Sequence, residues 1–163
     1  MTKYLFSLFL LTLICFSACT KRDVKNTTVP TESSKTSPQS PEDAETLYNQ
    51  GIDYYKQNDF MQAAQKFRKA AELDHAGAQF NLAALYRFGS GVPKDLEQAI
   101  HWYSKAAEQG YMDAQLSLGI MYYKGTDIPQ DFEKAEKWLS LAAKQGNQDA
   151  IDVLDDVRNM LVK

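Results

Sequence analysis

Hydrophobic and polar residues divide this chain into three stretches of different character. Residues 5–14 form an almost unbroken apolar run that follows a single lysine, Lys3. Residues 20–40 have almost no large apolar side chains and are rich in Thr, Ser, Lys and Pro. Beyond Ser40 the pattern predicts helix throughout. The chain is therefore expected to contain an apolar leader, a polar linker and an all-α domain over residues 41–163.

The helical region repeats itself every 36 residues. The stretch "WYSKAAEQG" at residues 102–110 returns as "WLSLAAKQG" at residues 138–146. The same shift relates further residues of six types: Ala78, Ala114 and Ala150; Leu82, Leu118 and Leu154; Tyr86 and Tyr122; Gly89 and Gly125; Pro93 and Pro129; Asp95 and Asp131. Repeats of this length stack to bury a shared core, because one helix pair cannot bury its apolar face alone.

Each repeat is predicted to hold two helices. The first covers residues 76–88 in one repeat and 112–124 in the next, and a glycine that favours a left-handed C-cap follows each. The second follows Asp59, Asp95 or Asp131, and each aspartate is interpreted as an N-cap. Three carboxylates spaced in this way would lie along the stack and would not converge on one catalytic point.

Small residues are predicted where the two helices approach each other. These are Ala83 or Gly119 on the first helix and Ala99 or Ala135 on the second. Large aromatic side chains then fill the space around the contact.

The earliest copy of the repeat departs from the pattern. It lacks four loop residues, and it has Lys66 where the later copies have tryptophan. Its first helix is predicted to begin at Pro41 with Ser40 as the N-cap. These departures indicate a capping repeat, and residues 148–162 are predicted to close the other end of the stack. Trp138 is predicted to be buried between the helices of its own repeat and this closing helix.

The motif "A-x-x-x-L-(A/G)-x-x-Y-x-x-G…P-x-D…A-x-x-W…A-A-x-x-G" resembles the Sel-one-like repeat, a relative of the tetratricopeptide repeat. Residues 78–110 and 114–146 are close matches. The resemblance implies a right-handed α-solenoid of about three repeats plus a closing helix. The expected boundaries are 44–75, 76–111 and 112–147 for the repeats and 148–162 for the closing helix.

The resemblance also implies a binding surface on the concave side, which the first helices line. Gly51, Ala83 and Gly119 are the equivalent small contact residues, and the candidates stand three residues before and four or five residues after them: Tyr48, Tyr55, Lys56, Phe80, Arg87, Leu116, Tyr123 and Lys124. Aromatic side chains and arginine are the types that dominate binding energy at interfaces. An alternative is that some of these side chains, Phe80 and Leu116 above all, pack between neighbouring repeats.

Signals for catalysis or for metal binding are weak in this sequence. His75 and His101 are the only histidines and lie at different repeat positions, whereas a metal site needs three or four convergent ligands. Some members of the family are linked to β-lactam hydrolysis, but the repeat region contains no serine followed three residues later by lysine. We therefore expect a non-enzymatic scaffold without a cofactor. A hydrolase or other factor acting on cell-wall glycan is the alternative.

Charge and the leader sequence indicate the location. A net charge of -3 gives no sign of a nucleic-acid surface, so no nucleic-acid partner is expected. The apolar run is followed by "FSAC" at residues 16–19, which resembles the bacterial lipoprotein signal except that Phe16 stands where leucine is preferred. Residues 1–18 would then be removed and Cys19 would carry lipid.

The expected mature protein is a monomer tethered to the periplasmic or outer face of an envelope membrane. The outer membrane is favoured because Thr20, not aspartate, follows the cysteine. Residues 19–40 are expected to form a disordered linker with a reach of roughly 25 Å. Ordinary cleavage of the leader would instead give a secreted factor that acts on a host cell.

Acylation of Cys19 can be tested directly. Metabolic labelling with an alkyne fatty acid should tag the wild-type protein and place it in the membrane fraction, because acyl chains hold a protein on a bilayer. The Cys19→Ser variant should be untagged and soluble. Equal labelling and fractionation of the two proteins would contradict the assignment.

Overall fold

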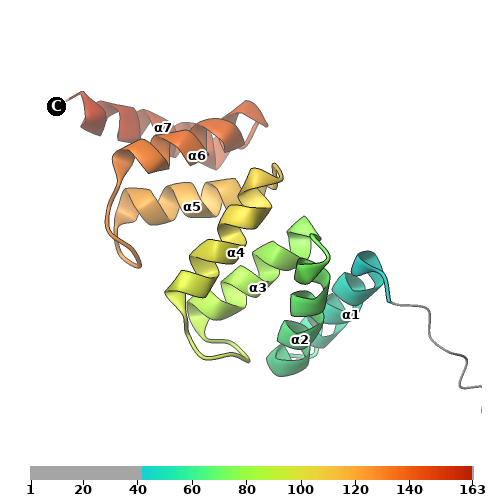
Figure 1. The fold of residues 1–163 in the computed structure, drawn as a ribbon. Helices are drawn as coiled ribbons and strands as arrows, with labels where there is room; N and C mark the ends of the chain where they lie inside the picture. Colours follow the sequence, from blue (N-terminus) through green and yellow to red (C-terminus); the bar gives the residue numbers. More distant parts are fainter. Residues whose placement is uncertain (1–41, 163) are drawn as a thin grey trace, which may run out of the picture. The chain divides into compact units, whose positions relative to one another are not determined.

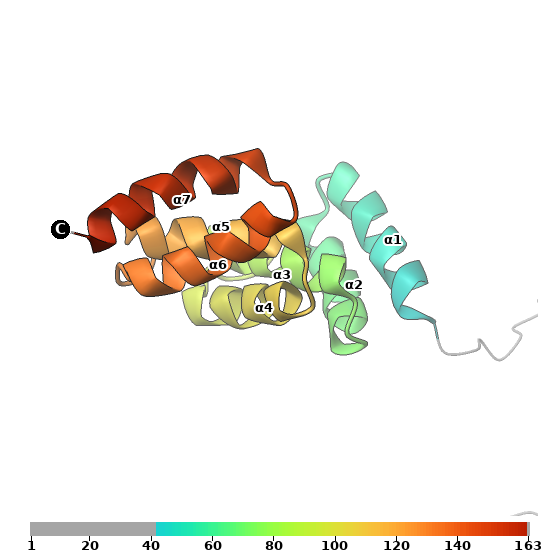
Figure 2. The same cartoon turned by 90° about the horizontal axis from the view of Figure 1, so that it is seen from above.

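The computed structural model describes residues 42–162, and this part of the chain folds into seven α-helices without a β-strand (Figure 1). The helices pack as consecutive pairs, and α2–α3 and α4–α5 contacts join each pair to the next (Figures 1 and 2). Their bounds are α1 (Ala44–Lys56), α2 (Phe60–Glu72), α3 (Ala76–Phe88), α4 (Leu96–Glu108), α5 (Met112–Lys124), α6 (Phe132–Lys144) and α7 (Gln148–Leu161). The all-α solenoid prediction is confirmed. The leader, Cys19 and the linker lie outside the described residues.

Side-chain and glycine caps set the helix ends. Asp59, Asp95 and Asp131 each accept a hydrogen bond, at 2.9–3.1 Å, from the backbone N–H three residues further on, and so begin α2, α4 and α6. Gly89 and Gly125 end α3 and α5 with φ of 72° and 64°, a left-handed conformation that costs glycine little. Both cap predictions are confirmed.

The predicted start of the first helix is wrong. Helix α1 begins at Ala44, and its N-cap is Asp43, whose carboxylate accepts a 2.7 Å hydrogen bond from the Thr46 N–H. That hydrogen bond holds the pKa of Asp43 below its usual value. The sequence interpretation used Ser40 as the cap and Pro41 as the first helical residue. Both lie outside the described residues.

Close approach within each helix pair depends on a small residue in the first helix. A Cβ atom on Gly119 would lie 2.5 Å from the Leu139 Cγ, and one on Gly51 would lie 2.5 Å from the Phe67 ring. Ala83, in the same register, is fully buried. Large side chains from the second helices therefore occupy the space that the missing side-chain atoms leave.

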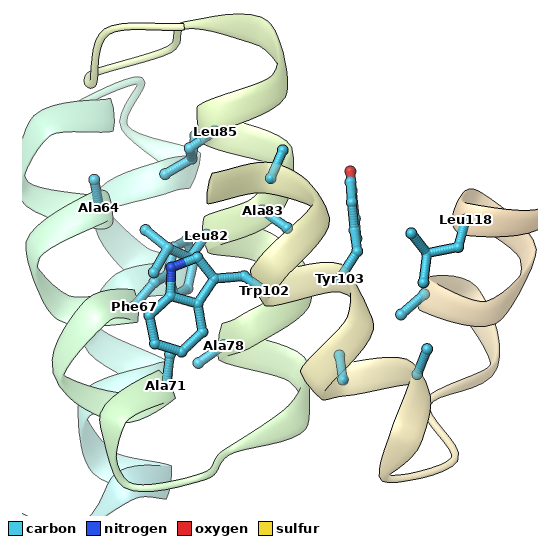
Figure 3. Packing of buried hydrophobic residues seen from close by; sticks show 14 of the residues in the cluster. Ala64, Phe67, Ala71, Ala78, Leu82, Ala83, Leu85, Trp102, Tyr103 and Leu118 are labelled. Carbon is cyan, nitrogen blue, oxygen red and sulfur yellow. The ribbon is translucent and has the colours of Figure 1, made fainter. Parts of the chain in front are cut away.

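Tryptophans join each repeat to the one before it. Figure 3 shows the Trp102 indole pointing from α4 toward α2 and α3, where Phe67, Ala71 and Leu82 belong to the same buried cluster. We call this surface, formed by the second helix of one repeat and the first helix of the next, the tryptophan slot. Each slot is thus filled by a tryptophan from the second helix of the later of the two repeats that form it.

The burial of Trp138 is confirmed, but its predicted contact with the closing helix is wrong. Trp138 is 8% exposed and belongs to the main cluster, which extends from α1 to α6. Leu154 and Val157 of α7 belong instead to a separate cluster with Leu139. Adjacent residues of α6 therefore face opposite neighbours, tryptophan toward the preceding repeat and leucine toward α7.

The first repeat has polar groups in place of the tryptophan. Lys66, at the tryptophan position, lies 3.7 Å from the Glu42 carboxylate. Gln50 donates a 3.0 Å hydrogen bond to the same carboxylate. No earlier repeat within the described residues offers an apolar surface there, so a solvated lysine suits this end of the stack.

A ladder of buried glutamines also crosses between repeats, and the sequence analysis missed it. Gln79 is fully buried, donates to the Ala71 carbonyl at 3.1 Å and accepts from Gln109 at 2.7 Å. Gln115 repeats the arrangement one repeat later, with Gln145 as donor at 2.8 Å. The signal was present, because these glutamines also recur at 36 residues.

Truncating the interlocking tryptophan should be costly. Trp102→Ala should lower the free energy of unfolding by roughly 3–5 kcal/mol, because it empties a packed slot. Lys66→Ala, the same position in the first repeat, should cost about 1 kcal/mol or less, as its ion pair is partly exposed. Urea titration measures both, and similar losses for the two variants would argue against the slot.

Candidate functional site

Two of the predicted binding residues pack between repeats. The Phe80 ring is half-buried and lies 5.6 Å from the Tyr103 ring and 5.3 Å from the Tyr111 ring. Leu116 packs against the buried cluster that α5, α6 and α7 share. Both side chains therefore contribute to packing, which is the alternative that the sequence left open.

Tyr48 is also held by neighbours. Its ring stacks on the His75 ring with centroids 4.3 Å apart. His75 caps α3, because its Nδ1 accepts a 3.1 Å hydrogen bond from the Ala78 N–H, and its Nε2 lies 3.0 Å from a carboxylate oxygen of Glu45. Since Nδ1 is an acceptor, Nε2 carries the proton. This histidine joins α1 to α3, as expected for an inter-helix residue.

The remaining candidates lie where the first helices end. Tyr55 and Lys56 close α1 and are exposed, Arg87 closes α3 together with Phe88, and Tyr123 and Lys124 close α5. Tyr55 is 49% exposed and Phe88 is 68% exposed. We call this surface the loop edge; it comprises Tyr55, Lys56, Arg87, Phe88, Tyr123 and Lys124.

The ends of α1 and α3 both contact the start of α2. The Tyr55 ring contacts the Phe60 ring edge-on, with centroids 5.2 Å apart. The α3–α4 loop crosses directly over the start of α2, where Gly91, with φ of 70°, has no room for a Cβ against the Phe60 backbone. Phe88 immediately precedes this loop. The two exposed aromatic side chains therefore both lie near the start of α2.

Arg87 is paired within the chain. Its Nη2 and Nε donate to one oxygen of Asp127, in the α5–α6 loop, at 2.7 and 2.8 Å. The two side chains are only 24% and 21% exposed. Arg87 thus ties the end of α3 to the next repeat and is not a free cation. The sequence analysis missed Asp127, which lies 40 residues away in a loop.

Tyr103 lies close to this ion pair. Burial raises the pKa of the Tyr103 hydroxyl, although the nearby Arg87 guanidinium acts in the opposite direction. The charged phenolate is therefore disfavoured in the folded protein.

Within residues 42–162, no three His, Cys, Asp or Glu side chains lie close enough together to hold a metal ion. None of the helices there has both the length and the apolar character needed to cross a membrane.

Comparison with known proteins agrees with the repeat pattern. The family model described as Sel1 repeat matches residues 44–75, 76–111 and 113–147. Helicobacter pylori HcpC, described by its name as a candidate beta-lactamase, is 41% identical over 56 residues. That match covers 34% of this chain and 19% of HcpC, so this chain spans a small part of its relative.

Three solved structures are similar in fold. The protective antigen c5321 of uropathogenic Escherichia coli, described as having an SLR fold, gives a TM-score of 0.67 at 34% identity over 72% of this chain and 26% of its own. A Sel1 repeat protein of Oxalobacter formigenes gives 0.65 at 31% identity over 69% and 46%. Helicobacter pylori cysteine rich protein B gives 0.54 at 25% identity over 68% and 94%.

Alkaline pH should destabilise the wild type more than Tyr103→Phe. Because the folded-state pKa of Tyr103 is raised, its contribution to stability is complete below about pH 10 and is lost as pH rises through the folded value. The free energy of unfolding of Tyr103→Phe should therefore fall less between neutral pH and about pH 11. Tyr55→Phe, at an exposed ring, is the matched control. Identical pH dependence for all three proteins would count against the assignment.

Proposed function

This chain belongs to the Sel1 repeat family, and from that premise we propose that it is a non-enzymatic scaffold that binds a protein or peptide at the bacterial cell envelope. Lipid on Cys19 would hold it to a membrane, with the repeats facing the periplasm. Support for the anchor comes from the apolar run and "FSAC" at residues 16–19. Support for binding comes from the family and from the loop edge.

The observation that carries the binding proposal is the exposure of Tyr55 and Phe88, which both lie near the start of α2. Neither side chain is needed to complete the core, and exposed apolar groups that gather on one face mark interaction sites. Tyrosine and phenylalanine offer large contact areas, and tyrosine is enriched among the residues that dominate binding.

The charges of the loop edge indicate the kind of segment that would bind. Asp127 already neutralises Arg87, whereas Lys56 and Lys124 are exposed at the ends of α1 and α5. A bound segment with apolar side chains between carboxylates would fit both the aromatic surface and the two ammonium groups. We therefore propose an acidic, apolar segment as the ligand.

Beta-lactam hydrolysis is the competing function, since the name of HcpC suggests it. Hydrolysis by a serine nucleophile would use a serine followed three residues later by lysine, and residues 44–163 contain none. A chromogenic cephalosporin assay on the purified protein distinguishes the two functions, and we expect no turnover above the uncatalysed rate.

Site-specific photo-cross-linking tests the binding surface. A photoreactive residue at position 55 or position 88 should capture the same envelope protein in living cells, because both positions are exposed and lie near the start of α2. The same residue at exposed Gln98, at the start of α4, should not capture it.

Double substitution provides the second arm. Tyr55→Ala with Phe88→Ala should abolish capture from a photoreactive residue at position 124 while leaving the circular dichroism spectrum unchanged, because both side chains are exposed. Capture from position 98 as efficient as from 55 and 88, or capture that survives the double substitution, would rule out the loop edge.

A further inference from the structure

The last two helices form a third tryptophan slot that no helix of the described chain fills. A hollow of about 400 Å³ lies between α6 and α7, within the size range of small binding pockets. Ala143 and Leu154 line it. They stand 72 residues, or two repeats, after Ala71 and Leu82, which lie in the cluster that buries Trp102. The hollow is therefore the register equivalent of the slots that Trp102 and Trp138 occupy.

At one position this slot is more apolar than its buried counterparts. Ile151 stands where the two earlier repeats have Gln79 and Gln115, which are 0% and 3% exposed, yet Ile151 is 38% exposed. A surface that only meets water would not be expected to replace a buried glutamine by an exposed isoleucine. The opposite end of the stack shows the contrast, since Lys66 and Glu42 close it with polar groups.

The slot is not shaped for another second helix of the same repeat. Asp155 stands where Ala83 and Gly119 allow the second helix to approach closely. A carboxylate there would meet the position that Tyr103 and Leu139 fill in the existing repeats. An incoming helix must therefore offer Asp155 a partner of opposite charge next to its aromatic residue.

Charge around the slot favours a basic ligand. Asp152, Asp155 and Asp156 are exposed on α7. Two cations also line the hollow, Lys144 and Arg158, and Arg158 is already paired with Glu136 at 3.0 Å. Exposed carboxylates beside an apolar hollow complement an amphipathic helix with basic residues.

We propose that the α6–α7 slot binds a helix of another protein, one that presents an aromatic side chain followed directly by lysine or arginine. The aromatic ring takes the place that Trp102 takes in its own slot, against Ala143, Ile151 and Leu154. The adjacent cation pairs with Asp155. This surface is separate from the loop edge, and its occupant need not be the same protein.

A probe can be built from the chain itself. A dye-labelled peptide of residues 131–146, with Leu139→Lys to place a cation directly after Trp138, carries the proposed chemistry on a native second-helix sequence. Fluorescence anisotropy with the full chain should show saturable binding. The same peptide with Trp138→Ala should bind at least about thirtyfold more weakly, as expected for an aromatic anchor.

Variants of the protein locate the site. Ala143→Glu, which fills the slot, and Asp155→Lys, which reverses its charge at an exposed position, should each weaken peptide binding at least about tenfold. Asp53→Lys, an exposed charge reversal on α1, is the matched control and should bind normally. Tyr55→Ala with Phe88→Ala should also bind normally, which separates this site from the proposed function.

Three results would overturn the proposal. The first is no saturable binding of the peptide by the wild type. The second is equal binding by the wild type, Ala143→Glu and Asp155→Lys. The third is a concentration-dependent dimer in analytical ultracentrifugation that Asp155→Lys dissociates, because the occupant would then be a second copy of this chain.

Discussion

The structure depends on a contact that each repeat makes with the one before it. Trp102, on α4, fills a slot that α2 of the preceding repeat and α3 of its own repeat form together, so α3 is buried only when both neighbours are present. Trp138 does the same one repeat later. Stability in such a stack is a sum of repeat and interface terms, and the interface term dominates when a tryptophan crosses it. A single helix pair cut from this chain would expose the apolar face that its neighbour covers.

The glutamine ladder adds direction and register to this apolar contact. A buried amide costs free energy unless its donors and acceptors are paired. Gln79 meets that demand only if the Ala71 carbonyl and the Gln109 amide arrive at fixed positions, from the helices before and after it. Apolar packing alone would tolerate small slips between repeats, whereas a buried hydrogen-bond chain does not. The constancy of the 36-residue interval in the later repeats is consistent with this constraint.

Local, repeated features could be predicted from the sequence, and contacts between repeats could not. Caps such as Asp95 and Gly89 act on backbone groups within a few residues, so spacing alone identifies them. The direction of Trp138 was predicted wrongly because a periodic sequence does not say which neighbour a residue faces. The pairing of Arg87 with Asp127 lies outside the repeat pattern. The preceding repeat has Gly91, and not a carboxylate, at the position equivalent to Asp127. The arginine predicted as a free binding residue therefore has a structural partner.

Asp155 also affects how this protein can change in length through evolution. Repeat arrays grow by duplication of one unit, and a new unit succeeds only where its second helix can approach the first. Within α3 and α5 that approach is open, because Ala83 and Gly119 are small. A unit copied into the middle of the array would meet compatible neighbours on both sides. One joined after α7 would meet a carboxylate in its core and would fold only after Asp155 had changed to a small residue or its own second helix had gained a cation, so expansion of the array is directed to its interior.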